Sequence, residues 1–425
     1  MLATEKLGSV TRRGTSLSGP ATRRAALAAG LCALVLTAAA AGLAWASGSP
    51  LVPRHGGHPG GSRAWSVAFL VLLSLAFVAY VVGAWLVRRV PPRTRAVAAI
   101  ACAIQLAPLA APLLLSTDAW TYWDYGRIAA VHHANPYRQP PSHFPDDPAY
   151  PYVGIAWRGT TSVYGPAFTL ASEPLALVAG TSADAAAWIY KSLAAVAMVA
   201  IAFLAARLSR RPALAWAVVG WSPALAIDFA GGGHNDAWPF ALVLAALVVA
   251  LSGRRELGGA GWALAALIKW IPLALLPLRL VEARARRVGF GYIGLAAAAV
   301  VLAALGTWRY GLAWTDTLRP LTEHAERGTA FALPHRLTQL GVPHDVSIAL
   351  LAAAFAVAYL WLLHGAWRGR ARLGLAAGLL LLAIPYLAAW YVVWTLPLAA
   401  AEDDEPAILL GLVLSAYLLS QAIRV

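Results

Sequence analysis

Residues 96–115 read AVAAIACAIQLAPLAAPLLL, and residues 116–127 continue as STDAWTYWDYGR. The first part is apolar and has the length of about 20 residues that a helix needs to cross a bilayer. The second part is aromatic and charged, so a membrane-spanning helix must end where it begins. Asp118 therefore stands at the rim of the bilayer, where a carboxylate is costly unless it pairs, is hydrated or takes part in chemistry.

The apolar character extends through the whole chain. Hydrophobic residues make up 60% of the sequence and charged residues only 12%, with a mean hydropathy of +0.66. One soluble core of this length could not bury so much apolar surface. The apolar runs are continuous and do not alternate, which excludes a closed barrel. We predict an all-α polytopic membrane protein with about 13 helical segments.

The formal net charge of +14 comes mainly from arginines at the ends of the apolar runs. This distribution is typical of cytoplasmic loops and does not indicate nucleic-acid binding, which would gather basic and aromatic residues on one face. The clusters are Arg88, Arg89, Arg93 and Arg95; Arg207, Arg210 and Arg211; Arg254 and Arg255; Arg279, Arg284, Arg286 and Arg287; and Arg368, Arg370 and Arg372.

With these clusters placed in the cytoplasm, the chain divides into three regions. Residues 1–24 are expected to be a basic cytoplasmic tail, 25–95 a transmembrane hairpin, and 96–425 the main transmembrane domain. Long loops at about 116–183 and 307–345 then lie outside the plasma membrane. The N-terminus is expected to be cytoplasmic, and Asp118 extracytoplasmic.

Two apolar segments do not fit simple crossings. Residues 163–179 would break the alternation of sides, so we expect a helix that lies on the outer leaflet. Residues 258–280 have arginines on both sides but are too short for two full spans. They predict two short helices that meet near Lys269 and Pro272.

The first outer loop is rich in the side chains that bind sugars. Aromatic faces stack on the apolar faces of sugar rings, while carboxylates and arginines bind hydroxyls and phosphates. The alternative is an ordinary polar loop with aromatic residues at the membrane interface. The candidates in this loop are Asp118, Tyr122, Asp124, Arg127, Tyr137 and Tyr164.

Asp118 is the first candidate for a catalytic carboxylate, and Asp124 is the second. The competing interpretation of Asp118 is an N-cap for a helix over residues 120–131, because Asp is a favoured N-cap residue. Asp124 would lie inside that helix, where a structural pair with Arg127, three residues on, is the alternative to catalysis.

Lysines within apolar sequence are candidates for binding a lipid-linked phosphate. Lys269 lies at the predicted helix break, where a cation and free backbone amides suit a phosphate. Lys191 lies within reach of the headgroups, and snorkelling is the alternative for it. His335 and Arg336 in the second outer loop are further phosphate candidates, with a solvated loop face as the alternative.

No metal or cofactor is expected. His234 and Asp236 lie two residues apart in a glycine-rich turn, and two ligands at that spacing are weak support for a metal site.

The chain resembles the polyprenyl-phosphate-dependent GT-C glycosyltransferases of actinobacteria. It is most similar to the mannosyltransferases of family 87 and to the related alpha-1,6-mannosyltransferases of lipomannan synthesis. The residues that carry the resemblance are Asp118 with Tyr122 and Gly126-Arg127, Asn135-Pro136-Tyr137, Tyr164-Gly165-Pro166, Asn235-Asp236, residues 266–272 (ALIKWIP) and residues 390–397 (WYVVWTLP).

The resemblance implies a GT-C fold over residues 96–425 and a membrane enzyme of cell-envelope lipoglycan synthesis. Such enzymes take a sugar from a polyprenyl-phosphate donor and add it to a glycolipid or glycan acceptor outside the plasma membrane. Asp118 would be the general base of an inverting displacement, and Lys269, His335 or Arg336 would stabilise the leaving phosphate. Sugar or acceptor contacts are expected from Tyr122, Arg127, Tyr137, Tyr164, His234, Asp236 and Trp390.

Two alternatives remain at this point. A flippase or transporter of lipid-linked sugars would also need lysines in the membrane, but it should place polar residues near the midplane on both sides of a gate. Among enzymes, the donor sugar could be arabinofuranose or another hexose instead of mannose, and the sequence leaves the acceptor open.

Overall fold

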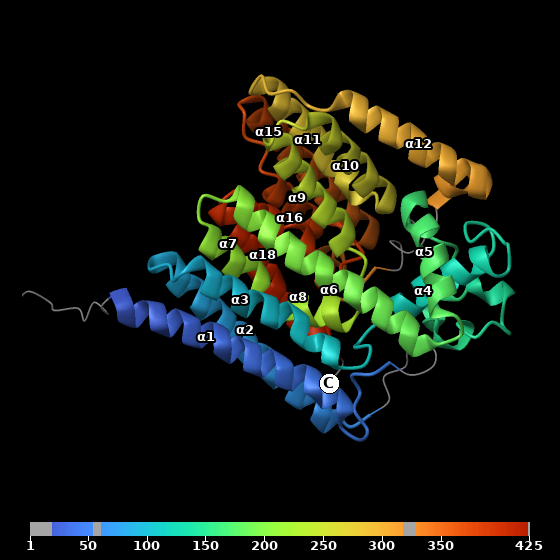
Figure 1. Cartoon of the computed structure of the whole chain (residues 1–425), viewed down its shortest axis with the longest axis horizontal. Helices are drawn as coiled ribbons and strands as arrows, with labels where there is room; N and C mark the ends of the chain where they lie inside the picture. The colour runs from blue at the N-terminus through green and yellow to red at the C-terminus, as the bar shows by residue number, and fades with distance from the viewer. Residues whose placement is uncertain (1–18, 54–60, 318–327, 424–425) are drawn as a thin grey trace, which may run out of the picture.

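The computed structural model describes residues 19–53, 61–317 and 328–423, and Figure 1 shows how its helices are arranged. All regular elements within these residues are helical. The α-helices are α1 (Gly19–Gly42), α2 (Arg63–Arg89), α3 (Thr94–Leu106), α4 (Asp118–Ala130), α5 (Pro166–Ala179), α6 (Ala183–Leu208), α7 (Pro212–Gly220), α8 (Pro223–Ala226), α9 (Ala237–Leu251), α10 (Arg255–Ile268), α11 (Ile271–Ala285), α12 (Tyr292–Tyr310), α14 (Leu333–Gln339), α15 (His344–Trp367), α16 (Leu373–Ala383), α17 (Leu396–Ala401) and α18 (Glu405–Leu418).

Five helices of the described chain are long and apolar enough to cross a membrane. They are α1, α2, α6, α12 and α15, two of them continued by short 3-10 turns. A sixth span results if the pair Pro212–Gly220 and Pro223–Gly231, bent by 56°, is counted as one. These spans and the helical content confirm the prediction of an all-α polytopic membrane protein.

Helix bounds add detail to the predicted regions. α1 begins at Gly19, so residues 19–24 of the expected tail are already helical. The first long loop contains α4 and α5, and α5, with 14 residues, is too short to cross a bilayer. In the second loop, residues 318–327 lie outside the described residues.

Small residues allow the first helices to pack closely on the rest of the bundle. The indole of Trp221, which follows α7, fits between α1 and α2, and Cβ atoms built on Gly30 or Gly83 would lie 2.9 Å from it. Its Nε1 donates to the carbonyl of Val97 in α3 at 3.0 Å. Close approach at small residues is the usual way in which membrane helices associate.

The predicted break between α10 and α11 is confirmed. α10 ends at Ile268, and Lys269 has an extended backbone with φ −150° and ψ 137°. α11 then begins at Ile271 with Pro272 in its first turn, where proline is tolerated because the N–H groups of that turn have no helical partner. The break places Lys269 between the end of α10 and the start of α11.

The start of α5 packs directly on this break. The N–H of Gly165 donates to the carbonyl of Ile268 at 3.0 Å, and a Cβ atom on Gly165 would lie only 2.0 Å from the carbonyl oxygen of Leu267. Only glycine permits so close an approach of two backbones. The contact brings the preceding residue, Tyr164, beside Lys269.

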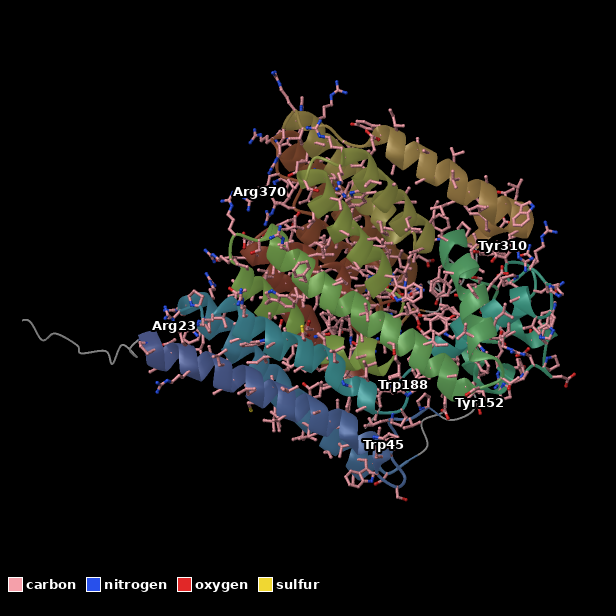
Figure 2. All side chains as sticks on the ribbon, viewed as in Figure 1. Arg23, Trp45, Tyr152, Trp188, Tyr310 and Arg370 are labelled. Carbon is pink, nitrogen blue, oxygen red and sulfur yellow. The ribbon has the colours of Figure 1, made fainter. Side chains whose placement is uncertain are left out.

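Labelled residues mark two opposite ends of the molecule. Figure 2 shows Arg23 and Arg370 at one end and Tyr152 and Tyr310 at the other. We call these the arginine end and the loop end. α4 and α5 lie at the loop end (Figure 1).

Candidate functional site

Asp118 is the first residue of α4, and two side chains hold its carboxylate. His234 Nδ1 lies 3.0 Å from Oδ2 of Asp118, and the hydroxyl of Tyr122 donates to the same oxygen at 3.3 Å. The helix-capping alternative is wrong, because Thr117 occupies the N-cap position and α4 has no side-chain cap. The N–H of Asp118 instead donates to the hydroxyl of Ser116 at 3.1 Å.

His234 lies in the turn that follows a short π-helix, Ile227–Gly231. Its side chain is 2% exposed and stacks on the indole of Trp390, with 3.7 Å between ring centroids and 14° between planes. Among short helical segments, π-turns are rare and often occur at functional sites. We expected His234 to contact a sugar, but it lies behind Asp118 and does not line the cavity described below.

Lys269 forms an ion pair with Asp236, with 2.7 Å between Nζ and Oδ1. The indole N–H of Trp394 donates to the same oxygen at 2.8 Å. The ammonium group also lies 5.4 Å from the ring centroid of Tyr391 and 5.9 Å from that of Tyr164, within the range of cation–π attraction. Aromatic rings and one carboxylate thus fix the cation, which is 18% exposed.

Asp118 and Lys269 line the same cavity, which has a volume of about 220 Å³. Most of its remaining wall is aromatic, and the rings come from three separate parts of the chain. They are Trp157, Tyr164, Trp270, Tyr386, Trp390, Tyr391 and Trp394. A carboxylate and an ammonium group inside an aromatic cavity can bind a polar ring and a negatively charged group together.

The surroundings of Asp118 keep it ionised. Burial raises the pKa of this carboxyl, but the hydrogen bond and charge of His234 and the charge of Lys269 outweigh burial. The net result is a pKa below the ordinary value of 3.8. Asp118 can therefore accept a proton at neutral pH.

Arg127 belongs to a different cluster. Its Nε donates to Asp147 at 2.8 Å, and its Nη1 to the carbonyl of Gly180 at 2.6 Å. His132 Nε2 lies 2.6 Å from the other oxygen of Asp147. The pair of Arg127 with Asp124, given above as the alternative to catalysis, is therefore wrong, and Arg127 holds the loop together without lining the cavity.

Asp124, the second catalytic candidate, is fully buried and does not line the cavity. Neither of its carboxylate oxygens has a hydrogen-bond partner among the described residues. Burial, and then the charge of Asp147, raise its pKa to about 8, against the opposing effect of Arg127. Asp124 is thus protonated at neutral pH, which does not suit a general base.

Five other predicted residues lie outside the cavity lining: Tyr122 and Asp236, which contact Asp118 and Lys269, and Tyr137, His335 and Arg336. Tyr137 bonds to the hydroxyl of Thr169 at 2.7 Å and supports the loop from behind. His335 and Arg336 lie on α14, where Arg336 donates to the hydroxyl of Tyr417 at 3.0 Å. The structure does not bring either α14 residue together with Lys269 in one cavity.

Lys191 is buried, so snorkelling toward the headgroups, the alternative given for it above, is wrong. Its ammonium group donates to the carbonyls of Ala111 and of Pro112, the latter at 3.1 Å. These carbonyls belong to the segment that leads from α3 to Asp118. Lys191 therefore stabilises the approach to the site from inside the bundle.

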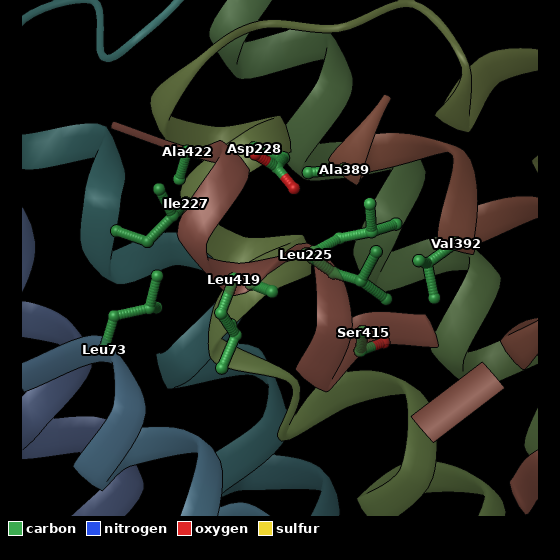
Figure 3. Close-up of a pocket in the computed structure, with 11 residues that line it drawn as sticks. Leu73, Leu225, Ile227, Asp228, Ala389, Val392, Ser415, Leu419 and Ala422 are labelled. Carbon is green, nitrogen blue, oxygen red and sulfur yellow. The ribbon is translucent and has the colours of Figure 1, made fainter. Parts of the chain in front are cut away.

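A small apolar pocket lies beside the π-helix (Figure 3). Asp228 points into it, and the other walls are mostly aliphatic, including Leu225, Leu419 and Val392. Only Ser415 adds a second polar side chain, so this pocket lacks the groups that bind a sugar.

The contact between His234 and Asp118 and most of the aromatic wall were not predicted from the sequence. Of the wall residues between 386 and 394, Trp390 was expected to contact a sugar. Tyr386, Tyr391 and Trp394 were assigned no contact, because aromatic residues there are also typical of a membrane interface. The 3-10 conformation of Ala389–Trp394 turns Trp390 and Trp394 into the site, and the sequence pattern did not predict that conformation.

Comparison of the sequence with known proteins assigns most of the chain to one protein family. Residues 27–285 match the family model described as alpha-(1->6)-mannopyranosyltransferase, N-terminal domain. This range includes Asp118, His234, Asp236 and Lys269 but not Trp390.

Two curated relatives are each 26% identical to the chain. One is a probable alpha-(1->6)-mannopyranosyltransferase of Mycolicibacterium smegmatis, matched over 69% of this chain and 62% of the relative. The other is an alpha-(1->6)-mannopyranosyltransferase of Mycobacterium tuberculosis, matched over 58% and 55%. The chain thus spans between about half and two thirds of their length, and no solved structure matches it.

Proposed function

The chain belongs to the alpha-(1->6)-mannopyranosyltransferase family, and from this we propose that it is a membrane glycosyltransferase that transfers mannose. The proposed donor is a polyprenyl-phosphate mannose, and the acceptor is a hydroxyl of a glycolipid or glycan outside the plasma membrane. The observation that carries the proposal is that an ionised carboxylate, Asp118, and a fixed cation, Lys269, line one aromatic cavity.

In the proposed reaction, Asp118 acts as the general base. It takes the proton of the acceptor hydroxyl while the hydroxyl oxygen forms a bond to the anomeric carbon of the sugar. The bond from that carbon to the phosphate oxygen breaks on the opposite face, and the electron pair leaves with the phosphate. A single displacement inverts the anomeric centre, so a beta-linked donor gives an alpha-mannoside.

Lys269 stabilises the charge that develops on the leaving phosphate. An ammonium group has three N–H donors, and Asp236 takes one of them in the described structure. The remaining donors are available to phosphate oxygens in the cavity. Because the lysine is held in place before the substrate binds, little reorganisation is needed as the charge develops.

The aromatic wall suits the sugar and the first part of the lipid. Rings such as Trp390 and Trp270 offer flat apolar faces to a hexose, and Tyr164 and Tyr391 flank the cation.

The proposal places the loop end outside the cell and the arginine end in the cytoplasm, in agreement with the positive-inside bias. Residues 96–425 would form the catalytic domain.

The test is transfer by the purified protein in nanodiscs. It should be supplied with a membrane glycolipid acceptor and a panel of polyprenyl phosphates that carry mannose, arabinofuranose or glucose. We expect transfer from the mannose donor. We expect Asp118→Asn to bind this donor with about the wild-type Kd and to lose at least about 100-fold in kcat. Wild-type turnover by Asp118→Asn would refute the general-base role, and transfer from another donor only would refute the assignment of mannose.

A further inference from the structure

A second, larger cavity lies at the arginine end, opposite to Asp118. Its volume is about 600 Å³, within the range of about 300 to 1,000 Å³ that is typical of ligand pockets. The ends of α6, α9, α11 and α16 and the residues before α18 form its walls. Arg370, on its rim, marks its place in Figure 2. We call it the arginine cavity.

All four carboxylates of the arginine cavity already have partners within the protein, so they offer little to a cation. Glu282 pairs with Arg279 at 2.6 Å, and Asp404 accepts two hydrogen bonds from the Arg372 guanidinium at 2.6 and 2.9 Å. Glu402 accepts hydrogen bonds from the backbone N–H groups of Leu373 and Gly374 at 2.6 and 3.0 Å. Asp403 accepts hydrogen bonds from the Ser209 hydroxyl at 2.6 Å and from the backbone N–H of Arg210 at 2.8 Å.

Two arginines of the same cavity have guanidinium groups without a partner. The side chains of Arg210 and Arg370 make no hydrogen bond, ion pair or ring contact within the described residues, and both are exposed. Because the four carboxylates are paired, the charged groups of the cavity that remain free to bind a ligand are these two guanidinium groups. Guanidinium groups bind phosphate strongly, often through two parallel hydrogen bonds.

One wall of the cavity is apolar. It is formed by Leu208 at the end of α6 and by Leu247 and Leu251 on α9. Leu251 is 77% exposed at the end of its helix, where apolar surface is expected to meet lipid. A ligand with a phosphate group and an adjoining hydrocarbon part would therefore match both walls, and basic pockets between membrane helices bind anionic headgroups.

We propose that the arginine cavity binds a phosphate group through Arg210 and Arg370. The group would come from the headgroup of an anionic phospholipid or from a soluble phosphate compound. This site is separate from the proposed transferase site and does not depend on it. Simple topogenic arginines, solvated and without a ligand, are the competing explanation.

The test uses the full-length protein in detergent, with native mass spectrometry to count bound lipids. The probes are phosphatidylglycerol, phosphatidylcholine and, as a soluble phosphate, inorganic pyrophosphate measured by calorimetry. We expect retention of phosphatidylglycerol over phosphatidylcholine. We expect the double variant Arg210→Gln/Arg370→Gln to weaken phosphatidylglycerol binding by about tenfold or more, because charge-assisted contacts are lost. Neither side chain has a partner among the residues that the structure describes, so we expect the variant to fold normally.

The matched control is Arg95→Gln/Arg254→Gln, which removes two exposed arginines that do not line the cavity. It should bind phosphatidylglycerol like the wild type. Pyrophosphate binding that the cavity variant loses would point to a soluble ligand, whereas lipid binding alone would identify the headgroup. Equal loss in both double variants, or no loss in the cavity variant, would overturn the proposal.

Discussion

His234 controls both the position and the charge of Asp118. Its Nδ1 bonds to the carboxylate at 3.0 Å, while stacking on Trp390 fixes the plane of the ring. It is thus a positioning residue, because it acts through Asp118 and does not line the cavity. The two nitrogens of the ring make this role testable, since only one of them faces the carboxylate.

We expect His234→Asn to keep most activity and His234→Gln to lose it. Asparagine places an amide nitrogen near the position of Nδ1, whereas glutamine places it near Nε2. His234→Gln and His234→Ala should lower kcat by about 10- to 100-fold, with little change in donor KM. Because His234 lowers the pKa of Asp118, the acidic limb of kcat/KM should move to higher pH in both variants. Equal activity of the Asn and Gln variants would contradict this role.

Asp124 should make the free energy of unfolding decrease as the pH rises. Its pKa is about 8 in the folded protein and near 3.8 when exposed, so the folded state binds the extra proton between these values. The resulting stabilisation is full below about pH 4 and is lost up to about pH 8, by at most about 1.4 kcal/mol per pH unit. Thermal unfolding from pH 5 to pH 9 should show this decline in the wild type.

Asp124→Asn is the control for that decline, because the amide does not titrate. The unfolding temperature of the variant should fall less between pH 5 and pH 8 than that of the wild type, because the contribution of Asp124 is absent, and the variant should keep its transferase activity. If instead it folds and transfers no sugar, Asp124 and not Asp118 would be the base.

At the scale of elements, breaks in the helices were predictable where the cause is local. Lys269 and Pro272 interrupt an apolar run, so the sequence predicted two helices that meet there, and the structure confirms them. The π-helix Ile227–Gly231 and the burial of Lys191 depend on contacts with distant segments. A local pattern contains no information about such partners, and for that reason these two features were missed.

The contact of Gly165 with α10 predicts a steric effect. Gly165→Ala should push α5 away from Leu267, because the new Cβ atom would meet a backbone oxygen at 2.0 Å. We expect a loss of about 1–3 kcal/mol in stability and at least a tenfold fall in kcat/KM, since Tyr164 and Lys269 would separate. Gly159→Ala in the same loop has open space for its Cβ and should behave like the wild type. A similar effect of both substitutions would contradict this explanation.

At the scale of the whole molecule, charge and hydropathy predicted which helix ends and loops lie on the same side of the membrane. These are sums over many residues, so single errors have little influence, and the labelled Arg23 and Arg370 do lie at the same end of the molecule (Figure 2). The pair of Asp118 and His234 joins positions 116 residues apart, and no alternation or spacing in one sequence indicates such a contact.

The proposed orientation predicts which surfaces a membrane-impermeant thiol reagent reaches. In a variant with Cys32 and Cys102 replaced by alanine, a cysteine at the exposed Asp146 should react in intact cells. A cysteine at the exposed Ser252, near the arginine clusters, should react only after the membrane is opened. The reverse pattern would place the proposed active site in the cytoplasm.

The ion pair between Lys269 and Asp236 also has a consequence for turnover. A lysine without a counter-ion would hold a free lipid phosphate tightly after the sugar has left, and the spent carrier would block the next cycle. Asp236 is always present to compete for the same ammonium group at 2.7 Å. If the proposed donor binds here, Asp236 keeps its contact with Lys269 throughout, so release of the carrier would leave no unpaired ammonium group behind.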